Sequence, residues 1–245
     1  MSIDLNADVG EGMDDGAIIP LLTSVNVACG LHAGGPATID RTVSLALSSR
    51  ARIGAHPSYA DRENFGRTEM DLTADEVQSL LLFQLGAVDA IVRSRGGKLA
   101  HVKPHGALYN RAARDAGLAQ AIALAVRSYR RDLVLVGLAG SLSIAAAREA
   151  GLSAAGEAFA DRRYLPSGAL MPRSQPGSVL TDPLAAAEQA VHIARDGFVV
   201  ASDGSRLRVS ADTLCLHGDT PGAAVIARTV RGRLQDAGVA LAPLA

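Results

Sequence analysis

The chain has 245 residues and a formal net charge of -1, and its 48% hydrophobic and 20% charged residues are typical of a soluble globular enzyme. Aromatic residues make up only 3%, tryptophan is absent and no basic stripe interleaves with aromatic side chains, which excludes the usual nucleic-acid-binding surfaces. The N-terminal stretch lacks a signal-peptide pattern and the apolar runs are too short and too interrupted to cross a bilayer, so we expect a cytoplasmic protein without membrane contact.

Short apolar runs alternate along the chain with segments of helical periodicity. The runs have the length of strands and are rich in Val, Leu and Ala. Seven strands are therefore predicted, at residues 3–9, 24–29, 51–56, 98–103, 133–138, 153–159 and 212–217.

Several of the predicted helices begin at recognisable capping signals. A Thr or Asp before the first turn can accept hydrogen bonds from backbone N–H groups, and proline fits the first helical position. Two further helices are predicted at about 115–130 and about 141–150. The marked starts are Pro36, the capping box Thr73-Ala74-Asp75-Glu76, Asp182-Pro183 and Thr220-Pro221.

Strands that alternate with helices indicate right-handed βαβ units and a parallel sheet. Seven such units in a chain of this length predict a TIM-like, seven-stranded parallel β/α barrel, and an open doubly wound sheet is the alternative. Residues 198–210 interrupt the alternation with a predicted hairpin that turns at Asp203-Gly204. No internal repeat or linker divides the sequence, so residues 1–245 are expected to form one domain.

The inner face of the predicted barrel carries polar side chains. Successive residues of a strand point to opposite faces, so the apolar and polar residues of each strand separate. A barrel interior is normally a packed apolar core, and carboxylates, imidazoles and a lysine in that place indicate a site. The residues assigned to this inner face include Asp4, Asn6, Asp8, His101, Lys103, His105 and Glu157.

Many polar residues fall at or just after the C-terminal ends of the strands, where the active sites of β/α barrels lie. His101 and His105 would be roughly 13 Å apart on a strand, which excludes them as joint ligands of one metal ion. His192 is expected to be an ordinary helix residue. The strand-end residues are Asp8, Glu11, His32, His56, Lys103, His105, Asp161, Arg162, His217 and Asp219.

Motifs along nearly the whole chain resemble those of the LamB/YcsF family and occur in the same order. Each motif alone is weakly specific, but together they are highly specific. They are DLNADVGEG, NVACGLHAGGP, IGAHPSYADRENFGR, HVKPHGALYN, GEAFADRRY, LMPRSQPGSV and CLHGD.

The resemblance implies a seven-stranded β/α barrel like those of glycoside hydrolases and polysaccharide deacetylases. It also implies a role as the A subunit of an ATP-dependent 5-oxoprolinase, which cleaves 5-oxo-L-proline (pyroglutamate) to L-glutamate in a complex with partner subunits B and C. The expected cofactors are ATP and its Mg²⁺. The sequence has no GxxxxGK[ST] motif, so ATP would occupy an unfamiliar pocket or a partner subunit.

The chain departs from the family pattern in three motifs. Gly35 stands where HAGDP has aspartate, Ala7 where LNCD has cysteine, and Thr68 where FGRR has its second arginine. Gly35 therefore cannot supply a carboxylate ligand, and Ala7 excludes a cysteine nucleophile at that position. The Asp, His, Lys and Glu residues shared with the family are retained.

Hydrolysis of an unstrained lactam needs a cation for the activated amide oxygen, a base for water and an acid for the ring nitrogen. Lys103 is expected to hold the phosphate or oxyanion, and an arginine to bind the substrate carboxylate. The candidate catalytic residues are Asp8, His56, Lys103, His105 and Glu157. The candidate substrate-binding residues are Asn26, His32, Arg67, Arg162, Arg173 and His217.

Two other functions stay open at this point. A metal-dependent amide hydrolase of the polysaccharide-deacetylase type would use Asp8, His32 and His56 as ligands. A noncatalytic binding subunit would make no chemical use of the polar face. The sequence shows no tight Cys/His cluster and Gly35 removes one carboxylate, so we expect a site metal to be dispensable or weakly held.

Overall fold

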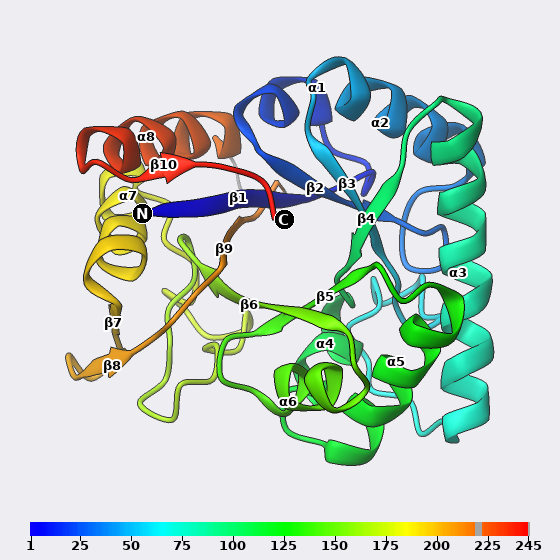
Figure 1. Cartoon of the computed structure of the whole chain (residues 1–245). Coiled ribbons are helices and arrows are strands. Elements are labelled where there is room, and N and C mark those ends of the chain that lie inside the picture. Colours follow the sequence, from blue (N-terminus) through cyan, green and yellow to red (C-terminus); the bar gives the residue numbers. More distant parts are fainter. Residues whose placement is uncertain (219–221, 245) are drawn as a thin grey trace.

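The computed structural model describes residues 1–218 and 222–244, and these form a closed barrel of seven parallel strands with helices around it (Figure 1). The strands follow one another around the barrel in chain order, and β9 closes the ring by pairing with both β6 and β1. The barrel strands are β1 (Ser2–Val9), β2 (Ser24–Ala28), β3 (Arg52–His56), β4 (Leu99–Val102), β5 (Val134–Leu138), β6 (Ser153–Phe159) and β9 (Thr213–Leu216).

The predicted barrel and its seven strands are confirmed, and their bounds differ from the predicted ones by one residue at most. The hairpin is also present, as β7 (Phe198–Val200) paired antiparallel with β8 (Arg206–Arg208). A short strand not foreseen from the sequence, β10 (Ala240–Leu241), pairs parallel with Ser2 and Ile3 at the start of β1.

The helices connect successive strands and cover the outside of the barrel (Figure 1). The short helices α1 and α4, together with the 3-10 turn Ile19–Leu21 and the π-helical turn His192–Asp196, were not predicted. The predicted start at Thr220-Pro221, like Asp219, lies outside the described residues. The helices are α1 (Asp15–Ile18), α2 (Pro36–Ser48), α3 (Ala74–Ser94), α4 (Gly106–Ala112), α5 (Ala116–Tyr129), α6 (Leu142–Glu149), α7 (Pro183–Val191) and α8 (Ala223–Asp236).

Helix α3 begins at the predicted capping box, in which the Thr73 hydroxyl accepts from the Glu76 N–H and the Glu76 carboxylate accepts from the Thr73 N–H. Its 21 residues are long and apolar enough to cross a membrane, which corrects the expectation that every apolar run is too short. Leu81, Leu85 and Val88 on one face are nevertheless buried within the hydrophobic core. The helix therefore packs as an outer layer of the barrel.

The interior of the barrel contains a hydrogen-bonded network of polar side chains, called here the polar floor, which comprises Asp4, Asn6, Thr23, Ser24 and Thr213. The Asp4 carboxylate accepts hydrogen bonds from the hydroxyls of Thr23, Ser24 and Thr213, at 2.6 to 2.7 Å. Burial raises the pKa of Asp4, and these donors offset only part of that effect. Asn6 extends the network by donating to Thr213 at 2.6 Å. The predicted separation of apolar outer and polar inner faces is thus confirmed.

Gly54 in β3 tests this interior packing, because a Cβ at that position would lie 2.1 Å from Nε2 of the His101 ring. We expect Gly54→Ala to lower the free energy of unfolding by about 1–3 kcal/mol, since the buried imidazole must move. Urea denaturation measures the change.

Gly86→Ala is the matched control, because nothing lies within 4 Å of a Cβ at that position in α3. Alanine is favoured over glycine in a helix interior, so this variant should be as stable as the parent chain or more stable. Equal stability of the two variants would contradict the packing described for Gly54.

Candidate active site

A cavity of about 900 Å³ opens at the C-terminal ends of the strands, within the range of roughly 300–1,000 Å³ usual for small-molecule sites. Three of the predicted site residues, Asn26, His32 and Glu157, are buried and do not line it. The predicted site residues on its wall are Asp8, His56, Arg67, Lys103, His105, Arg162, Arg173 and His217.

Lys103 lies at the base of the cavity between two carboxylates. Its Nζ is 2.9 Å from both Asp8 Oδ1 and Glu157 Oε1, and it is only 2% exposed. Burial alone would lower the pKa of Lys103, but the carboxylates of Asp8 and Glu157 outweigh it and hold that pKa well above its usual value. Lys103 is therefore a fixed cation at neutral pH.

Asn26 holds the Asp8 carboxylate that binds Lys103. Its Nδ2 donates to Asp8 Oδ1 at 2.9 Å and to Asn6 Oδ1 at 2.8 Å. Its Oδ1 is paired with Nε2 of His101 at 2.8 Å, and burial lowers the pKa of His101 to about 3, so His101 is a neutral core histidine. Asn26 thus orients Asp8 without reaching the cavity.

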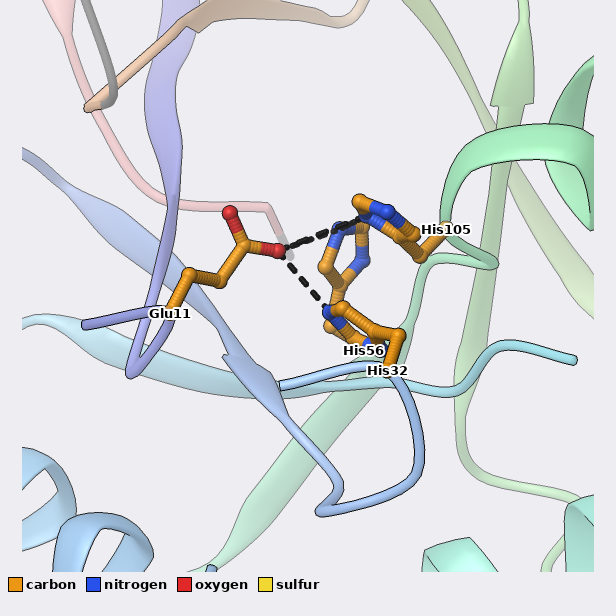
Figure 2. Close-up of side chains that lie close together, drawn as sticks. All are labelled: Glu11, His32, His56 and His105. Atoms are coloured by element: carbon orange, nitrogen blue, oxygen red, sulfur yellow. Dashed lines mark hydrogen bonds and ion pairs between the residues drawn. The ribbon is translucent and has the colours of Figure 1, made fainter. Parts of the chain in front are cut away.

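Three imidazoles and a carboxylate gather beside Asp8, and Figure 2 shows Glu11, His32, His56 and His105 pointing toward one another. One ligand atom from each of these residues lies within 4.8 Å of those of the others. Nδ1 of His105 is 2.9 Å from Nε2 of His56, and Glu11 Oε1 is 3.4 Å from the former and 3.8 Å from the latter. The expectation that the chain has no tight histidine cluster is therefore wrong.

The grouping of Asp8, His32 and His56 as metal ligands needs correction. Asp8 is bound to Lys103, and its other oxygen lies 3.2 Å from His56 Nε2. Glu11 is the carboxylate nearest His32, at 2.9 Å. Loop residues beyond β1 and β2 bring Glu11 and His32 into place, so strand periodicity could not identify this pair.

The charge states within the cluster differ. Burial opposes protonation of His56, but Asp8 outweighs it and raises the pKa of His56. Burial lowers the pKa of His32 to about 3 and, together with His56, holds the pKa of His105 well below its usual value. His32 and His105 are therefore neutral and can act as acceptors or metal ligands.

Two carbonyls of the loop after β3 accept hydrogen bonds from residues at the start of α4. The N–H of Ala107 donates to the Gly66 carbonyl at 3.0 Å, and Nε2 of His105 is 2.9 Å from the Phe65 carbonyl. Gly66 and Gly106 both have positive φ angles, and a Cβ on Gly106 would lie 2.5 Å from the Gly66 oxygen. Only glycine fits this approach without strain.

A second titratable group lies at the end of β9. The Asp161 carboxylate accepts from the backbone N–H of His217 at 2.8 Å and lies 2.8 Å from Nδ1 of its ring. His217 stacks on Phe159 and lines the cavity. Burial raises the pKa of Asp161, but His217 outweighs it and the net pKa is lowered, so Asp161 is ionised and leaves Nε2 of His217 for a ligand.

The three predicted arginines have different surroundings. The guanidinium of Arg162 donates to the carbonyls of Ser178 and Met171, and burial lowers its pKa to about 10. It therefore holds the loop that covers part of the cavity. Arg67 stacks over Phe65 at 4.9 Å from the ring centre, and like Arg173 it reaches the cavity wall.

Sequence reasoning assigned no role to Glu11, Asp161 or Tyr109. Glu11 and Asp161 were identified as strand-end residues, but their partners are fixed by loop geometry that periodicity does not describe. Tyr109 comes from α4 and lines the cavity, and burial with the neighbouring Glu157 holds its pKa well above the usual value. Its position within HVKPHGALYN was the available signal.

Comparison with known proteins gives matches over the whole chain. The model of the LamB/YcsF family matches residues 3–245. The chain is 48% identical to the A subunit of 5-oxoprolinase from Methylococcus capsulatus, over 99% of this chain and 96% of that protein. It is 49% identical to the protein of the same name from Heliobacterium modesticaldum, over 98% of this chain and 97% of that protein.

Solved structures agree with the barrel. The crystal structure of a lactam utilization protein from Thermus thermophilus superposes with a TM-score of 0.93 at 46% identity, covering 100% of both chains. A putative cellobiose-phosphate cleavage protein from Enterococcus faecalis superposes with a TM-score of 0.58 at 12% identity, over 99% of this chain and 97% of that chain, which shows a shared fold only.

We expect Lys103→Met to destabilise the chain by about 3–5 kcal/mol, because Asp8 and Glu157 would be left as buried carboxylates without their cation. Chemical denaturation measures the loss. The double variant Lys103→Met/Glu157→Gln should regain part of it, since one unpaired charge is removed.

Lys98→Met is the control for this prediction. Lys98 is paired with Asp132 at the surface, where its side chain is 73% exposed, so the change should cost less than about 1 kcal/mol. A Lys103→Met variant as stable as Lys98→Met would show that Lys103 does not neutralise the interior.

Proposed function

The chain belongs to the LamB/YcsF family, and from that premise we propose that it is the A subunit of an ATP-dependent 5-oxoprolinase, a hydrolase that opens 5-oxoproline to glutamate. The observation that carries the proposal is the identity of 48 to 49% to proteins of that name over almost the full length of both chains. The polar cavity at the barrel mouth supports it, because it offers the groups that lactam hydrolysis needs.

The substrate carboxylate is assigned to Arg173 and Arg67, which lie on the cavity wall. The third arginine on the wall, Arg162, is assigned to the covering loop, because its guanidinium donates to the carbonyls of Ser178 and Met171. Arginine suits this role since its planar fork can bind a carboxylate through two hydrogen bonds. The lactam ring would then extend toward Lys103 and the imidazoles.

The lactam amide needs activation, because an unstrained amide resists water at neutral pH. Transfer of a phosphoryl group from ATP to the amide oxygen would make the ring carbon electrophilic. Water then adds to that carbon, and the carbon–nitrogen bond breaks as the nitrogen takes a proton. A second water hydrolyses the acyl phosphate that remains, which releases glutamate and phosphate. Lys103, a cation on the cavity wall, is proposed to stabilise the negative charge that develops on the amide oxygen.

His217 is proposed as the residue that moves a proton, with Asp161 as its positioning residue. Asp161 binds both the ring Nδ1 and the backbone N–H of His217, which fixes the direction of Nε2. A histidine held in this way can take a proton from water or give one to the leaving nitrogen. This role goes beyond the substrate binding that the sequence predicts for His217.

ATP with its Mg²⁺ is proposed to enter through the complex rather than through a phosphate loop of this chain. The sequence has no GxxxxGK[ST] motif. We propose that partner subunits B and C complete the nucleotide site, and that the complex acts in the cytoplasm. The relatives are themselves named as one subunit of their enzyme, which supports an assembly of several different chains.

A metal-dependent amide hydrolase is the second candidate function, and the cluster of Glu11 with three histidines favours it. Such an enzyme would hydrolyse its amide without nucleotide. Omitting ATP from an otherwise complete assay therefore separates the two candidates.

We expect the purified chain to release little glutamate from 5-oxoproline with ATP and Mg²⁺, and to become active when subunits B and C are added. Glutamate and ADP are quantified together, and their release should be equimolar. Rapid release by this chain alone would contradict the division of labour, and inactivity of the complete complex would contradict the proposed function.

We also expect His217→Gln to lower kcat of the complex by about 10²–10⁴ with a smaller change in KM, because a positioned proton carrier is lost. Asp161→Asn should act in the same direction and shift the pH profile. His192→Gln is the control, since His192 stacks on Phe198 away from the cavity. A His217→Gln enzyme that works as well as His192→Gln would remove His217 from the mechanism.

A further inference from the structure

The imidazoles of His56 and His105 are each fixed by a backbone carbonyl. Nδ1 of His56 is 2.7 Å from the Lys103 carbonyl, and Nε2 of His105 is 2.9 Å from the Phe65 carbonyl. A carbonyl oxygen can only accept, so each of these ring nitrogens carries a hydrogen. In the neutral rings the lone pairs are therefore on Nε2 of His56 and Nδ1 of His105.

These two lone pairs point at each other across 2.9 Å. Two acceptors at that separation repel unless something positive lies between or beside them. One proton on Nε2 of His56 would join this pair, or would bind Asp8 Oδ2, which is 3.2 Å from the same nitrogen. Glu11 Oε1 also points to this place, 3.4 Å from His105 Nδ1 and 3.8 Å from His56 Nε2. A cation that binds all three atoms accounts for the arrangement more completely than a proton does.

We propose that Glu11, His56 and His105 form a binding site for a divalent transition-metal ion of the Zn²⁺ class. Imidazole nitrogen with one carboxylate oxygen is a donor set that such ions prefer, whereas Mg²⁺ and Ca²⁺ prefer oxygen alone. Nitrogens 2.9 Å apart can both lie at the usual metal–nitrogen distance of about 2.1 Å from one ion. The paired carbonyls are the outer partners that metal-binding histidines usually have.

His32 is assigned a supporting role outside the metal's own ligands. Its Nε2 is 2.9 Å from Glu11 Oε1, and its ring lies parallel to that of His105 with centres 4.0 Å apart. Two parallel stacked rings cannot both direct a nitrogen to one ion. His32 therefore orients Glu11, and its buried ring is off the cavity wall whereas the three proposed ligands line it.

The position of the site gives the ion open coordination positions that face the cavity. Three protein ligands with positions left for water or substrate are the pattern of catalytic rather than structural zinc sites. Glu11 supplies the ion with one anionic oxygen ligand beside the two imidazole nitrogens. An ion there could polarise a carbonyl or activate water. That use rests on the proposed function, whereas binding of the ion does not.

Titration of the whole chain with Zn²⁺ and with Co²⁺ tests the site without ATP, 5-oxoproline or partner subunits. The chain is first dialysed against a chelator and then against buffer. We expect one equivalent of Zn²⁺ to bind in calorimetry, one equivalent of Co²⁺ to give visible absorption bands, and Mg²⁺ not to compete. Binding well below one equivalent to folded protein, or equal binding of Mg²⁺, would overturn the proposal.

Variants locate the site. Loss of a residue that only orients a metal ligand typically weakens metal binding by about 10–100-fold, and we expect this effect from His32→Gln. Glu11→Gln and His105→Gln remove ligands themselves, so each should weaken Zn²⁺ binding by more than that. His217→Gln is the control, because it removes a cavity histidine outside the cluster and should leave affinity unchanged. Circular dichroism confirms folding, and Glu11→Gln decides the matter if His105→Gln does not fold. Unchanged affinity in Glu11→Gln would refute the assignment.

Discussion

The buried ammonium of Lys103 is the contact on which the rest of the site depends. It joins three strands, because Asp8 comes from β1, Lys103 follows β4 and Glu157 lies on β6. Carboxylates in a barrel interior are costly unless they are paired, so this cation makes the polar floor tolerable. The same residue also fixes the adjacent imidazole, since its carbonyl faces Nδ1 of His56. Charge balance and ring orientation are thus set at one position.

The chemical groups of the cavity fall into two sectors. The imidazole cluster belongs to the ends of β1, β2, β3 and β4, and the His217–Asp161 pair to the ends of β6 and β9. Between them β5 contributes the apolar Leu138 to the wall, and Lys103 lies at the base. The proposed substrate, bound over Lys103, would therefore have the imidazole cluster on one side and the imidazole of His217 on the other.

The alternation of strands with helices predicted the barrel. Because successive side chains of a strand point to opposite faces and the outer face must be apolar to contact the helices, the polar residues were assigned to the inner face. The same rule placed Asp8, Lys103 and His105 together, as they lie on strands or directly after them. The rule does not describe how deep a residue lies along the barrel axis. Asn26 and Glu157 were therefore predicted as site residues, but they are buried and do not line the cavity. Nor could the rule pair Glu11 with His32, since loop conformation rather than periodicity brings them together.

The close approach of Gly66 to Gly106 means that two residues without side chains help to orient the imidazole of His105. Because the Ala107 N–H binds the Gly66 carbonyl, and the neighbouring Phe65 carbonyl faces His105, the loop and the helix start are joined as one unit. A larger residue at either glycine would displace that unit and would change the direction in which the His105 lone pair points. The backbone at positions 66 and 106 therefore fixes the orientation of a histidine side chain, and substitutions there should be as restricted as at the histidines themselves.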